Sequence, residues 1–446
     1  MDLLEKLRSK QAHIAVIGLG YVGLPLAVEK ARAGFRVTGI DSNAERVEKV
    51  NQARNYIGDV VSEDLSAVVS EGRLRATSSF EPVADADVVT ICVPTPLDCH
   101  KQPDMSYIEH VVEASLPYLH PDQLVVLEST TYPGTTEELI RPRVESRGLT
   151  VGDDIFLAFS PERVDPGNAR YRTRNTPKVV GGMTKRCTEA AKVLYENVLS
   201  AGVHTVSSPK AAEMTKLLEN VFRAVNIALV NELAMLSERM GIDIWEVIEA
   251  ASTKPFGYMP FYPGPGLGGH CIPLDPFYLS WKAKEYGFPT RFIELAGQIN
   301  DGMPQHVLER TARLLNRQGF ALHGSRVMLV GISYKRNVGD LRESPSLELA
   351  DLLAERGAEI CYHDPLVPSA ELAGRPMRSV ELEPDSLHRI RLAVILSNHD
   401  CINTSQIVKH APLILDTRNA TAGMQADHVF RLGAEGSASP QEEVGG

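Results

Sequence analysis

The chain has 446 residues, more than one ordinary core accommodates, and this length predicts two or three domains. Hydrophobic residues make up 43% and charged residues 23%, as in soluble globular proteins. The net charge of −11 argues against a nucleic-acid-binding protein, although a local pocket could still bind an anion. The sequence has neither a secretory signal nor an apolar stretch long enough for a membrane helix, so we expect a cytoplasmic protein without a membrane partner.

The cysteines are scattered along the chain and form no Cys-x-x-Cys pair. Their spacing fits neither a zinc site nor a disulfide framework, so we expect reduced thiols and no bound metal. The six are Cys92, Cys99, Cys187, Cys271, Cys361 and Cys401.

The first half of the chain alternates short apolar runs with helical patterns. This alternation predicts a doubly wound α/β domain, which we assign to residues 1–208. The predicted parallel strands are His13–Ile17, Arg36–Ile40, Asp87–Cys92, Leu124–Glu128 and Ile155–Phe159.

A long helix without internal Gly or Pro is predicted for residues 209–240, with Pro209 at its start and Gly241 at its stop. Its apolar residues exceed a single stripe, which favours burial on more than one side, as in a spine between domains or a dimer surface. More helix is expected over 277–302. We assign 209–305 to a central helical region that carries catalytic and dimerisation residues.

A second strand-helix alternation begins near Ser325 and predicts a smaller α/β domain over 306–432, followed by a disordered tail over 433–446. This domain is no simple repeat of the first, because it lacks the full glycine fingerprint. The predicted architecture is therefore two Rossmann-like, doubly wound domains joined by a long central helix. The predicted strands here are Arg326–Val330, Ala358–Tyr362, Leu392–Leu396 and Leu413–Asp416.

The segment HIAVIGLGYVG places Gly18, Gly20 and Gly23 in Gly-x-Gly-x-x-Gly spacing after a strand and before a helix. Such glycines allow a pyrophosphate to approach the helix N-terminus closely. Asp41 ends the second strand, where its carboxylate could bind a ribose diol and would repel a 2′-phosphate. NAD is favoured over NADP; the alternative is a purely structural turn.

Three further motifs follow predicted strands at the sheet edge where open α/β sheets bind ligands: residues 93–96, 128–134 and 160–163. Thr130 could donate a hydrogen bond to a cofactor or water, or could cap the next helix. Glu162 could act as a general acid or base, although its spacing alone favours a solvated loop residue.

Lys216 and Asn220 stand one turn apart on the predicted long helix. A lysine in an apolar segment is paired or functional, so it could form an ion pair with Glu213 or Glu219. It could instead serve as a base or stabilise an alkoxide.

Cys271 lies in the glycine-rich segment GPGLGGHCIPLDP, whose glycines would let the backbone approach another group closely. A cysteine beside His270 could form a Cys–His nucleophile, but neighbours in an extended segment point to opposite sides. An inert, buried thiol is the alternative.

Taken in order, the motifs GLGYVGLP, VPTP, ESTTYPGTT, SPERVDPG, EMTKLLEN, GPGLGGHCIPLDP and GISYKRNVGDLRESPS resemble the UDP-glucose/GDP-mannose dehydrogenase family, the nucleotide-sugar 6-dehydrogenases. The resemblance covers residues 12–430. It implies an N-terminal NAD domain, a central dimerising region, and a C-terminal domain that helps to bind a UDP-sugar. A homodimer or higher homo-oligomer is expected.

The resemblance also implies roles for individual residues. The implied catalytic residues are Cys271, Lys216, Asn220, Asp275, Glu162 and Thr130. The expected cofactor-binding residues are Gly18, Gly20, Tyr21, Val22, Gly23, Asp41, Arg46, Pro94, Thr95, Thr130 and Arg342. The expected substrate-binding residues are Glu162, Arg163, Lys216, Asn220, Arg223, Tyr262, Gly268, His270, Lys335 and Arg418.

His270 and Leu274 replace the Ser and Lys of the UDP-glucose branch, and the segment around them is most like the UDP-N-acetylglucosamine enzymes. The implied reaction is a four-electron oxidation of the C6 hydroxyl to a uronate through a Cys271 thiohemiacetal and thioester, for surface-polysaccharide precursors. UDP-GalNAc, UDP-ManNAc, UDP-glucose and GDP-mannose are alternative substrates. A two-electron hydroxyacid dehydrogenase and a non-catalytic nucleotide-sugar sensor are the alternative functions.

Overall fold

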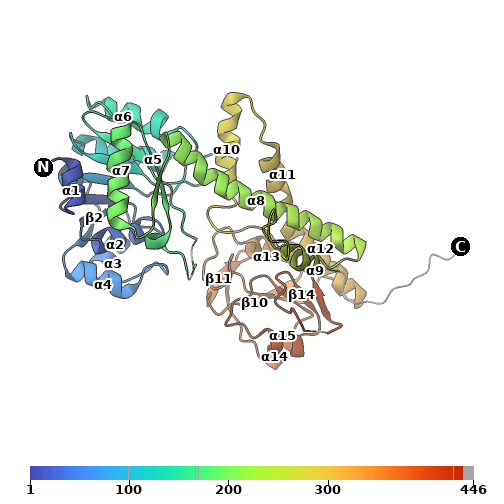
Figure 1. The fold of residues 1–446 in the computed structure, drawn as a ribbon. Helices are drawn as coiled ribbons and strands as arrows, with labels where there is room; N and C mark the ends of the chain where they lie inside the picture. Colours follow the sequence, from blue (N-terminus) through green and yellow to red (C-terminus); the bar gives the residue numbers. More distant parts are fainter. Residues whose placement is uncertain (99, 166, 169, 425, 435–446) are drawn as a thin grey trace. The chain divides into compact units, whose positions relative to one another are not determined.

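The structure is a computed structural model and describes residues 1–98, 100–165, 167–168, 170–424 and 426–434. The chain folds into two compact units (Figure 1). Unit 1 comprises Met1–Glu219 and Phe277–Pro289, and unit 2 comprises Asn220–Pro276 and the chain from Thr290 onward. The division into an NAD domain, a central region and a C-terminal domain at the boundaries given above stays a prediction.

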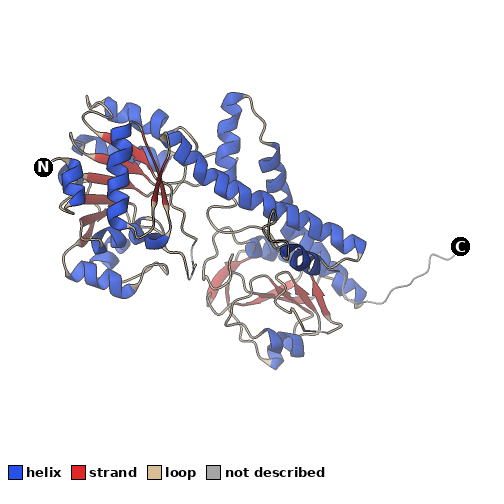
Figure 2. Ribbon diagram, viewed as in Figure 1, coloured by secondary structure: helices blue, strands red, loops and turns tan. Residues whose placement is uncertain are grey.

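Unit 1 is built on an eight-stranded sheet in the order β3-β2-β1-β4-β5-β6-β7-β8. Strands β1 to β6 run parallel, β7 pairs antiparallel with β6, and β8 pairs parallel with β7. Helices lie on both sides of these strands (Figure 2). The strand order reverses direction between β1 and β4, which is the ligand-binding position of a Rossmann sheet.

The strands of unit 1 are β1 His13–Ile17, β2 Arg36–Ile40, β3 Leu74–Thr77, β4 Val88–Ile91, β5 Leu124–Leu127, β6 Phe156–Phe159, β7 Lys178–Gly182 and β8 Val203–Thr205. Its helices are α1 Leu3–Arg8, α2 Gly23–Arg32, α3 Ala44–Asn51, α4 Ser62–Ser70, α5 Ser106–Ser115, α6 Arg141–Glu145 and α7 Lys185–Val198. The short helical turns are η1 Glu81–Asp85, η2 Leu116–Tyr118, η3 Thr136–Ile140, η4 Thr173–Asn175 and η5 Lys284–Tyr286.

The five strands predicted for the first half correspond to β1, β2, β4, β5 and β6. Strands β3, β7 and β8 were not predicted. Each of the five is almost wholly buried and mostly apolar, whereas β3 and β8 are partly exposed and β7 ends in two glycines. The predicted doubly wound fold class is confirmed.

Unit 2 contains a five-stranded parallel sheet in the order β10-β9-β13-β14-β15 and a separate β11-β12 hairpin. Its strands are β9 Arg326–Val330, β10 Glu359–His363, β11 Ser369–Leu372, β12 Arg375–Arg378, β13 Leu392–Ile395, β14 Ile414–Asp416 and β15 Val429–Arg431. Its other helices are α9 Ile244–Ser252, α11 Arg291–Asp301, α12 Met303–Arg317, α13 Pro345–Glu355, α14 Pro384–His388 and α15 Thr404–His410.

Successive residues of β9 enter different cores, as the period of two along a strand requires. Val327 and Leu329 pack into a cluster with residues of α12 and α13. Met328 and Val330 pack into a second cluster on the other face, with residues of α14 and α15. The sheet of unit 2 is therefore covered on both faces, which explains why its central strand β13 is apolar throughout.

Helix α8 runs from Pro209 to Met240, as predicted, and passes from unit 1 into unit 2. The prediction of a single helical stretch over 277–302 is wrong. This segment consists of the end of α10 (Asp275–Ala283), the turn η5, and α11. Gly287 and Pro289 stand between η5 and α11, and a proline cannot continue a helix from the residues before it.

The start of the predicted disordered tail is ordered. Gly433 and Ala434 are buried, the Gly433 N–H donates to Glu238 (2.9 Å), and the Ala434 carbonyl accepts from Arg310 (3.1 Å). The rest of the predicted tail, 435–446, lies outside the described residues. Among the described residues, no helix combines the length and the apolar character needed to cross a membrane.

The turns that follow β1 and β9 share one hydrogen-bond pattern. Gly18 and Gly331 both adopt positive φ, +90° and +71°, and each donates its N–H to the last residue of the neighbouring strand. The next residue in each turn donates its N–H to an aspartate, Asp41 or Asp364, at 2.8 Å. The turn at the sheet edge of unit 2 is thus built like the glycine-rich turn of unit 1, although the sequence fingerprint is incomplete.

Candidate active site

The glycine turn after β1 leaves open space for a ligand. A Cβ on Gly23 would overlap the Gly18 carbonyl oxygen, and a Cβ on Gly18 would lie 2.5 Å from the Cys92 carbonyl oxygen. Both glycines are therefore needed by the turn itself. Gly20, in contrast, has open space on its Cα, with no atom within 4 Å of where a Cβ would lie, and Val22 caps α2 without a side-chain hydrogen bond. This arrangement fits a pyrophosphate at the helix N-terminus.

Asp41 lies beside the same turn and is buried. One carboxylate oxygen accepts the Leu19 N–H and the other accepts the Asn43 N–H, both at 2.8 Å, and Arg46 lies 3.5 Å away. Each oxygen retains a lone pair for a hydroxyl group. These residues fit a dinucleotide with a free ribose diol, as expected from the sequence.

The threonine-containing loop after β5 is fastened to α8 by a buried carboxylate. Glu213 accepts hydrogen bonds from Gly134 N (2.5 Å), Thr136 N (3.0 Å) and Thr136 Oγ1 (2.7 Å). Burial raises the pKa of Glu213, while these donors oppose the shift. Glu213 lies almost one turn before Lys216 on α8, so it ties the loop that carries Thr130 to the helix that carries Lys216. The sequence suggests an ion pair between Glu213 and Lys216 as one alternative, but it does not predict that Glu213 binds the loop after β5.

Glu162 follows β6 and its carboxylate is held on both oxygens. Oε1 accepts the N–H groups of Arg163 and Val164, both at 2.8 Å, and Oε2 lies 3.3 Å from Lys178 Nζ. The Glu162 carbonyl accepts from Lys216 Nζ at 2.7 Å, and Lys216 is buried. The Glu162 carboxylate is therefore held by hydrogen bonds, and its backbone carbonyl binds Lys216, which differs from the solvated loop residue that its spacing favoured.

A buried charge cluster lies behind Glu162. Glu128, at the end of β5, accepts hydrogen bonds from Lys178 and from Tyr195, both at 2.5 Å, and Lys30 lies 3.5 Å away. Burial acts to raise the pKa of Glu128, but the two lysines hold it below its usual value. Burial lowers the pKa of Lys30. Opposite charges inside the fold must be paired, so this cluster fixes the strand ends around the site.

Unit 2 contributes a second group of predicted residues. Asn220 Nδ2 donates to Asp275 Oδ2 at 2.5 Å, and both side chains are buried. The N–H groups of Leu274 and Asp275 donate to the Cys271 carbonyl, which forms a turn leading into α10. Cys271 is half-buried in this turn. The contact between Asn220 and Asp275 thus connects α8 to the segment that carries Cys271.

The glycines before Cys271 pack against protein atoms of unit 2. A Cβ on Gly264 would lie 2.5 Å from the Arg418 guanidinium, and a Cβ on Gly268 would lie 2.6 Å from Tyr334. A Cβ on Gly269 would lie 2.7 Å from the Tyr334 ring. These glycines let the loop lie directly on residues that follow β9 and β14, and the close approach of a sugar to this loop stays a prediction.

Arg418 follows β14 and is half-buried. Its Nε donates to the Leu396 carbonyl at 2.8 Å. Burial lowers its pKa to about 10, against the opposing effect of Asp416. The guanidinium therefore remains charged at neutral pH, as binding of a phosphate or carboxylate requires.

The remaining predicted residues are distributed over both units. In unit 1, Tyr21 and Pro94 are exposed, Thr95 is buried, and Arg163 forms an ion pair with Glu219 at 2.6 Å. In unit 2, Arg342 contacts Asp340 at 2.6 Å and Tyr262 stacks on Trp245 with ring centroids 6.1 Å apart. Arg223 is exposed, while Thr130, His270 and Lys335 are half-buried. Their roles in binding stay predictions.

The fold and the site fit the class of nicotinamide-dependent dehydrogenases. The features that fit it are two Rossmann-like sheets, a glycine turn beside the buried carboxylate of Asp41, and a buried Lys216 that donates to the Glu162 carbonyl. Three family models cover most of the chain: the NAD binding domain of the UDP-glucose/GDP-mannose dehydrogenase family matches residues 12–199, its central domain residues 210–302, and its UDP binding domain residues 328–423. The chain belongs to this family of NAD-dependent nucleotide-sugar dehydrogenases, and the resemblance predicted from its motifs is confirmed.

Named relatives act on different sugars. The UDP-N-acetyl-D-glucosamine 6-dehydrogenase of Pseudomonas aeruginosa is 39% identical over 363 residues, 81% of this chain and 84% of that protein. The NDP-N-acetyl-D-galactosaminuronic acid dehydrogenase of Ralstonia solanacearum is 38% identical and covers 91% of this chain and 95% of its own length. The solved structure of the UDP-D-ManNAc dehydrogenase of Pyrococcus horikoshii has a TM-score of 0.86 at 31% identity, over 94% of this chain and 99% of that one.

The open space at Gly20 generates a prediction for the NAD domain. Gly20→Ala introduces a methyl group where no protein atom lies within 4 Å, so folding should be unaffected while the pyrophosphate loses its close approach. We expect a Kd for NAD about tenfold higher, measured by titration calorimetry, with an unchanged melting temperature of the free protein. Gly58→Ala, also in open space, is the control. Unchanged NAD affinity in Gly20→Ala would show that the dinucleotide binds elsewhere.

Proposed function

We propose that the protein oxidises the C6 hydroxyl of a UDP-N-acetylhexosamine to the carboxylate, with UDP-GlcNAc as the first candidate substrate. Support comes from the 39% identity to a UDP-N-acetyl-D-glucosamine 6-dehydrogenase and from His270 and Leu274 in the loop around Cys271. Relatives named for galacto and manno sugars make UDP-GalNAc and UDP-ManNAc the next candidates, ahead of UDP-glucose and GDP-mannose.

The observation that carries this proposal is the hydrogen bond from Asn220 on α8 to Asp275, because Asp275 lies on the segment that contains Cys271. An alcohol needs only a base and a hydride acceptor to become an aldehyde. An aldehyde does not readily transfer the hydride on its carbonyl carbon until a nucleophile has added to that carbon. A thiol at Cys271 would supply that nucleophile, and a simple two-electron hydroxyacid dehydrogenase would not need it.

In the first half-reaction, a base removes the C6 hydroxyl proton. Lys216 and a water bound by Asp275, Asn220 and Thr130 are both candidates for this base. NAD, when bound, accepts the hydride of each oxidation. The Lys216 ammonium and the Asn220 amide would then stabilise the oxyanions that form on C6.

In the second half-reaction, the Cys271 sulfur bonds to the aldehyde carbon and gives a thiohemiacetal. Loss of a hydride from this carbon leaves a thioester. Water then attacks the thioester carbonyl, the C–S bond breaks, and the uronate and the free thiol are released. Glu162, whose backbone carbonyl accepts from Lys216 Nζ, is the candidate base for this water. The net reaction consumes one water and reduces two NAD molecules per sugar.

The substrate panel tests the function directly. NADH formation is measured with UDP-GlcNAc, UDP-GalNAc, UDP-ManNAc, UDP-glucose and GDP-mannose, and the uronate is counted per NADH. We expect the highest kcat/KM with UDP-GlcNAc and about two NADH per uronate. One NADH per product would favour the two-electron dehydrogenase, and no turnover with any of them would favour the non-catalytic sensor.

Cys271→Ser tests the covalent scheme. The first oxidation does not require the thiol, so the variant should bind the substrate with unchanged affinity and release little uronate. We expect uronate formation to fall by about 1000-fold or more, as when a nucleophile is removed. Cys401→Ser, at an exposed cysteine, is the control. Normal uronate yield from Cys271→Ser would exclude the thioester route.

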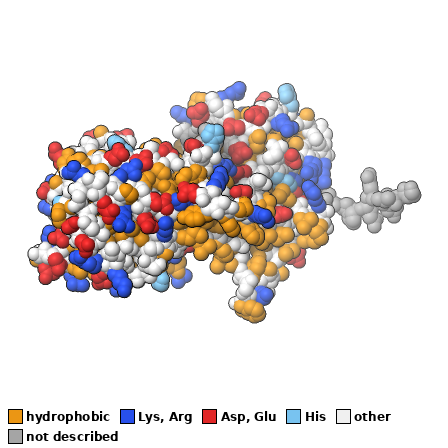
Figure 3. All heavy atoms as spheres, turned by 90° about the horizontal axis from the view of Figure 1, so that it is seen from above, with side chains coloured by type: hydrophobic (Ala, Val, Ile, Leu, Met, Phe, Trp, Pro, Cys, Tyr) orange, Lys and Arg blue, Asp and Glu red, His pale blue; other side chains and the backbone are white. Residues whose placement is uncertain are grey.

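We further propose a cytoplasmic homodimer that supplies precursors for a surface polysaccharide. Hydrophobic side chains gather on one face of the molecule (orange in Figure 3). Within unit 2, one stripe of α8 leaves large apolar side chains exposed, from 40% for Leu233 to 60% for Met240. The stripe consists of Phe222, Leu229, Leu233, Leu236 and Met240. Such a stripe on a long helix fits a second copy of the same helix around a two-fold axis.

Leu229→Glu tests this dimer. A charge in the middle of the stripe would have to be buried unpaired, so the dimer should dissociate at concentrations where the unaltered protein stays associated. We expect half the apparent mass in sedimentation equilibrium. Tyr107→Glu, at an exposed residue of α5, is the control. A monomeric unaltered protein, or an unchanged mass in Leu229→Glu, would contradict the proposal.

A further inference from the structure

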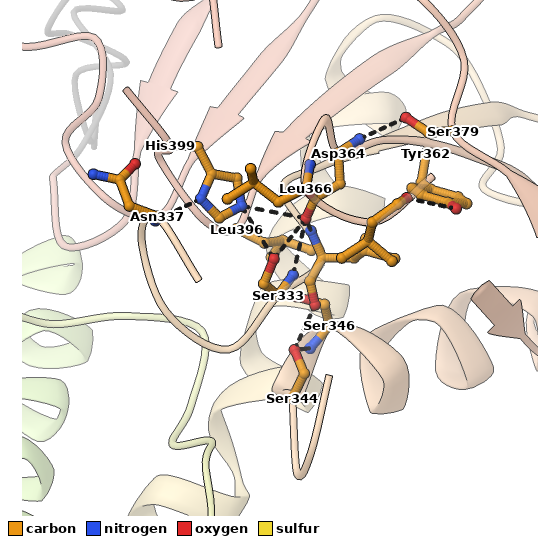
Figure 4. Close-up of polar contacts among 12 residues, drawn as sticks. Ser333, Asn337, Ser344, Ser346, Tyr362, Asp364, Leu366, Ser379, Leu396 and His399 are labelled. Atoms are coloured by element: carbon orange, nitrogen blue, oxygen red, sulfur yellow. Dashed lines mark hydrogen bonds and ion pairs between the residues drawn. The ribbon is translucent and has the colours of Figure 1, made fainter. Parts of the chain in front are cut away.

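A buried polar cluster at the carboxyl edge of the unit 2 sheet holds the segment that follows β9. Asp364 Oδ2 accepts hydrogen bonds from Ile332 N (2.8 Å), Ser333 N (3.1 Å) and Ser333 Oγ (2.8 Å). His399 Nε2 lies 3.2 Å from the same oxygen and 3.1 Å from Ser333 Oγ. These side chains converge from the loops after β9, β10 and β13 (Figure 4).

His399 also closes the turn at its far end. Its Nδ1 accepts the Asn337 N–H at 2.8 Å, as the dashed line on the left of Figure 4 shows. A ring nitrogen that accepts from a backbone N–H carries no proton, so the neutral ring carries its proton on Nε2, where it donates toward Asp364. His399 therefore joins Asn337 to Asp364 and anchors both ends of the turn 333–337.

This cluster is not a hydrolytic triad. In such a triad, the carboxylate and the nucleophile contact opposite nitrogens of the imidazole. Here Ser333 and Asp364 both lie against Nε2, and all three side chains are at most 2% exposed. Burial acts to raise the pKa of Asp364, but the hydrogen bonds from His399 and Ser333 hold it well below its usual range. The carboxylate serves as a fixed acceptor for the turn.

The turn anchored in this way contacts the loop that carries Cys271. Tyr334, directly after Ser333, fills the space where side chains at Gly268 and Gly269 would lie. The Gly269 N–H donates to the Arg342 carbonyl at 3.0 Å, further along the same segment. Cys271 follows two residues after Gly269. The backbone on which the thiol stands is thus supported by Tyr334, and Tyr334 lies between the two points that the cluster fixes.

We propose that His399 is a positioning residue for the Cys271 thiol, acting through the turn 333–337 and Tyr334. This inference depends on the proposed role of Cys271 as the nucleophile of the second oxidation. Loss of the anchor at Asn337 would let Tyr334 and the glycine loop shift, which misplaces the sulfur relative to the aldehyde carbon. The first oxidation does not use the sulfur, so the two half-reactions should respond differently.

A pair of substitutions separates the two functions of the imidazole. In His399→Asn, the side-chain oxygen can still accept the Asn337 N–H, whereas the contact with Asp364 is lost. In His399→Gln, the amide can still donate to Asp364, whereas the acceptor for Asn337 is lost. His388→Gln makes the same chemical change at an exposed position of α14 and is the matched control.

The first readout is stoichiometry with the best nucleotide sugar of the panel. In His399→Gln we expect the second oxidation to slow by about 10- to 100-fold, because a displacement of about 1 Å has effects of this size. Aldehyde is then released, and NADH per sugar consumed falls from about two toward one. His399→Asn and His388→Gln should stay near two. A general loss of stability would slow both oxidations together and leave the ratio unchanged, and that result would overturn the proposal.

The second readout is amide hydrogen exchange in the free enzyme. In His399→Gln we expect faster exchange in peptides covering 333–343 and also in those covering 264–271. Faster exchange confined to 333–343 would show that the turn does not support the Cys271 loop, and would overturn the proposal. If the unaltered enzyme oxidises no nucleotide sugar, the proposed function fails, and the exchange measurement still decides whether the support exists. If His399→Gln fails to fold, Tyr334→Ala replaces it, because this change removes the supporting ring and leaves the cluster intact.

Discussion

Both α/β sheets depend on the same interaction, a buried aspartate at the end of the second strand that accepts backbone N–H groups from the turn after the first strand. Asp41 does this for the turn after β1, and Asp364 does it for the turn after β9. The residues of the turn that leaves a strand have backbone N–H groups outside the hydrogen-bond ladder of the sheet. A buried carboxylate can accept from several of these N–H groups at once. The glycine turn of unit 1 and the loop that supports Cys271 in unit 2 are both positioned in this way.

The two turns differ at their third residue. In unit 1 this residue is Gly20, which faces open space. In unit 2 it is Ser333, whose hydroxyl donates to Asp364. The first turn thus has room for a dinucleotide, whereas in the second the serine side chain fills one of the acceptor positions of the aspartate.

Buried carboxylates of unit 1 hold the segments that carry the predicted residues Thr130, Glu162 and Lys216. Glu213 fixes the threonine loop to α8, and Glu128 holds Lys178, which in turn contacts Glu162. Burying a charge is costly unless it is paired and hydrogen-bonded, so each of these groups has one well-defined geometry.

The sequence by itself determined those parts of the protein that depend on the residue pattern within one helix, strand or turn. The strands β1, β2, β4, β5 and β6 could be predicted because burial on both faces leaves mostly apolar segments. The bounds of α8 and the glycine turn with Asp41 could be predicted from Pro209, Gly241 and the glycine spacing. The family of the protein follows from the order of its sequence motifs.

Only the tertiary structure decided which segments meet. The pattern of Gly268 and Gly269 predicts a close approach to another group but does not show that Tyr334, more than sixty residues away along the chain, packs against them. Glu213 looked like a partner for Lys216 and binds the backbone of Gly134 and Thr136 instead. His399 carried no motif at all. A residue pattern reports how its own element is buried, whereas contacts across the carboxyl edge of a sheet are set by strand order, which no local pattern encodes.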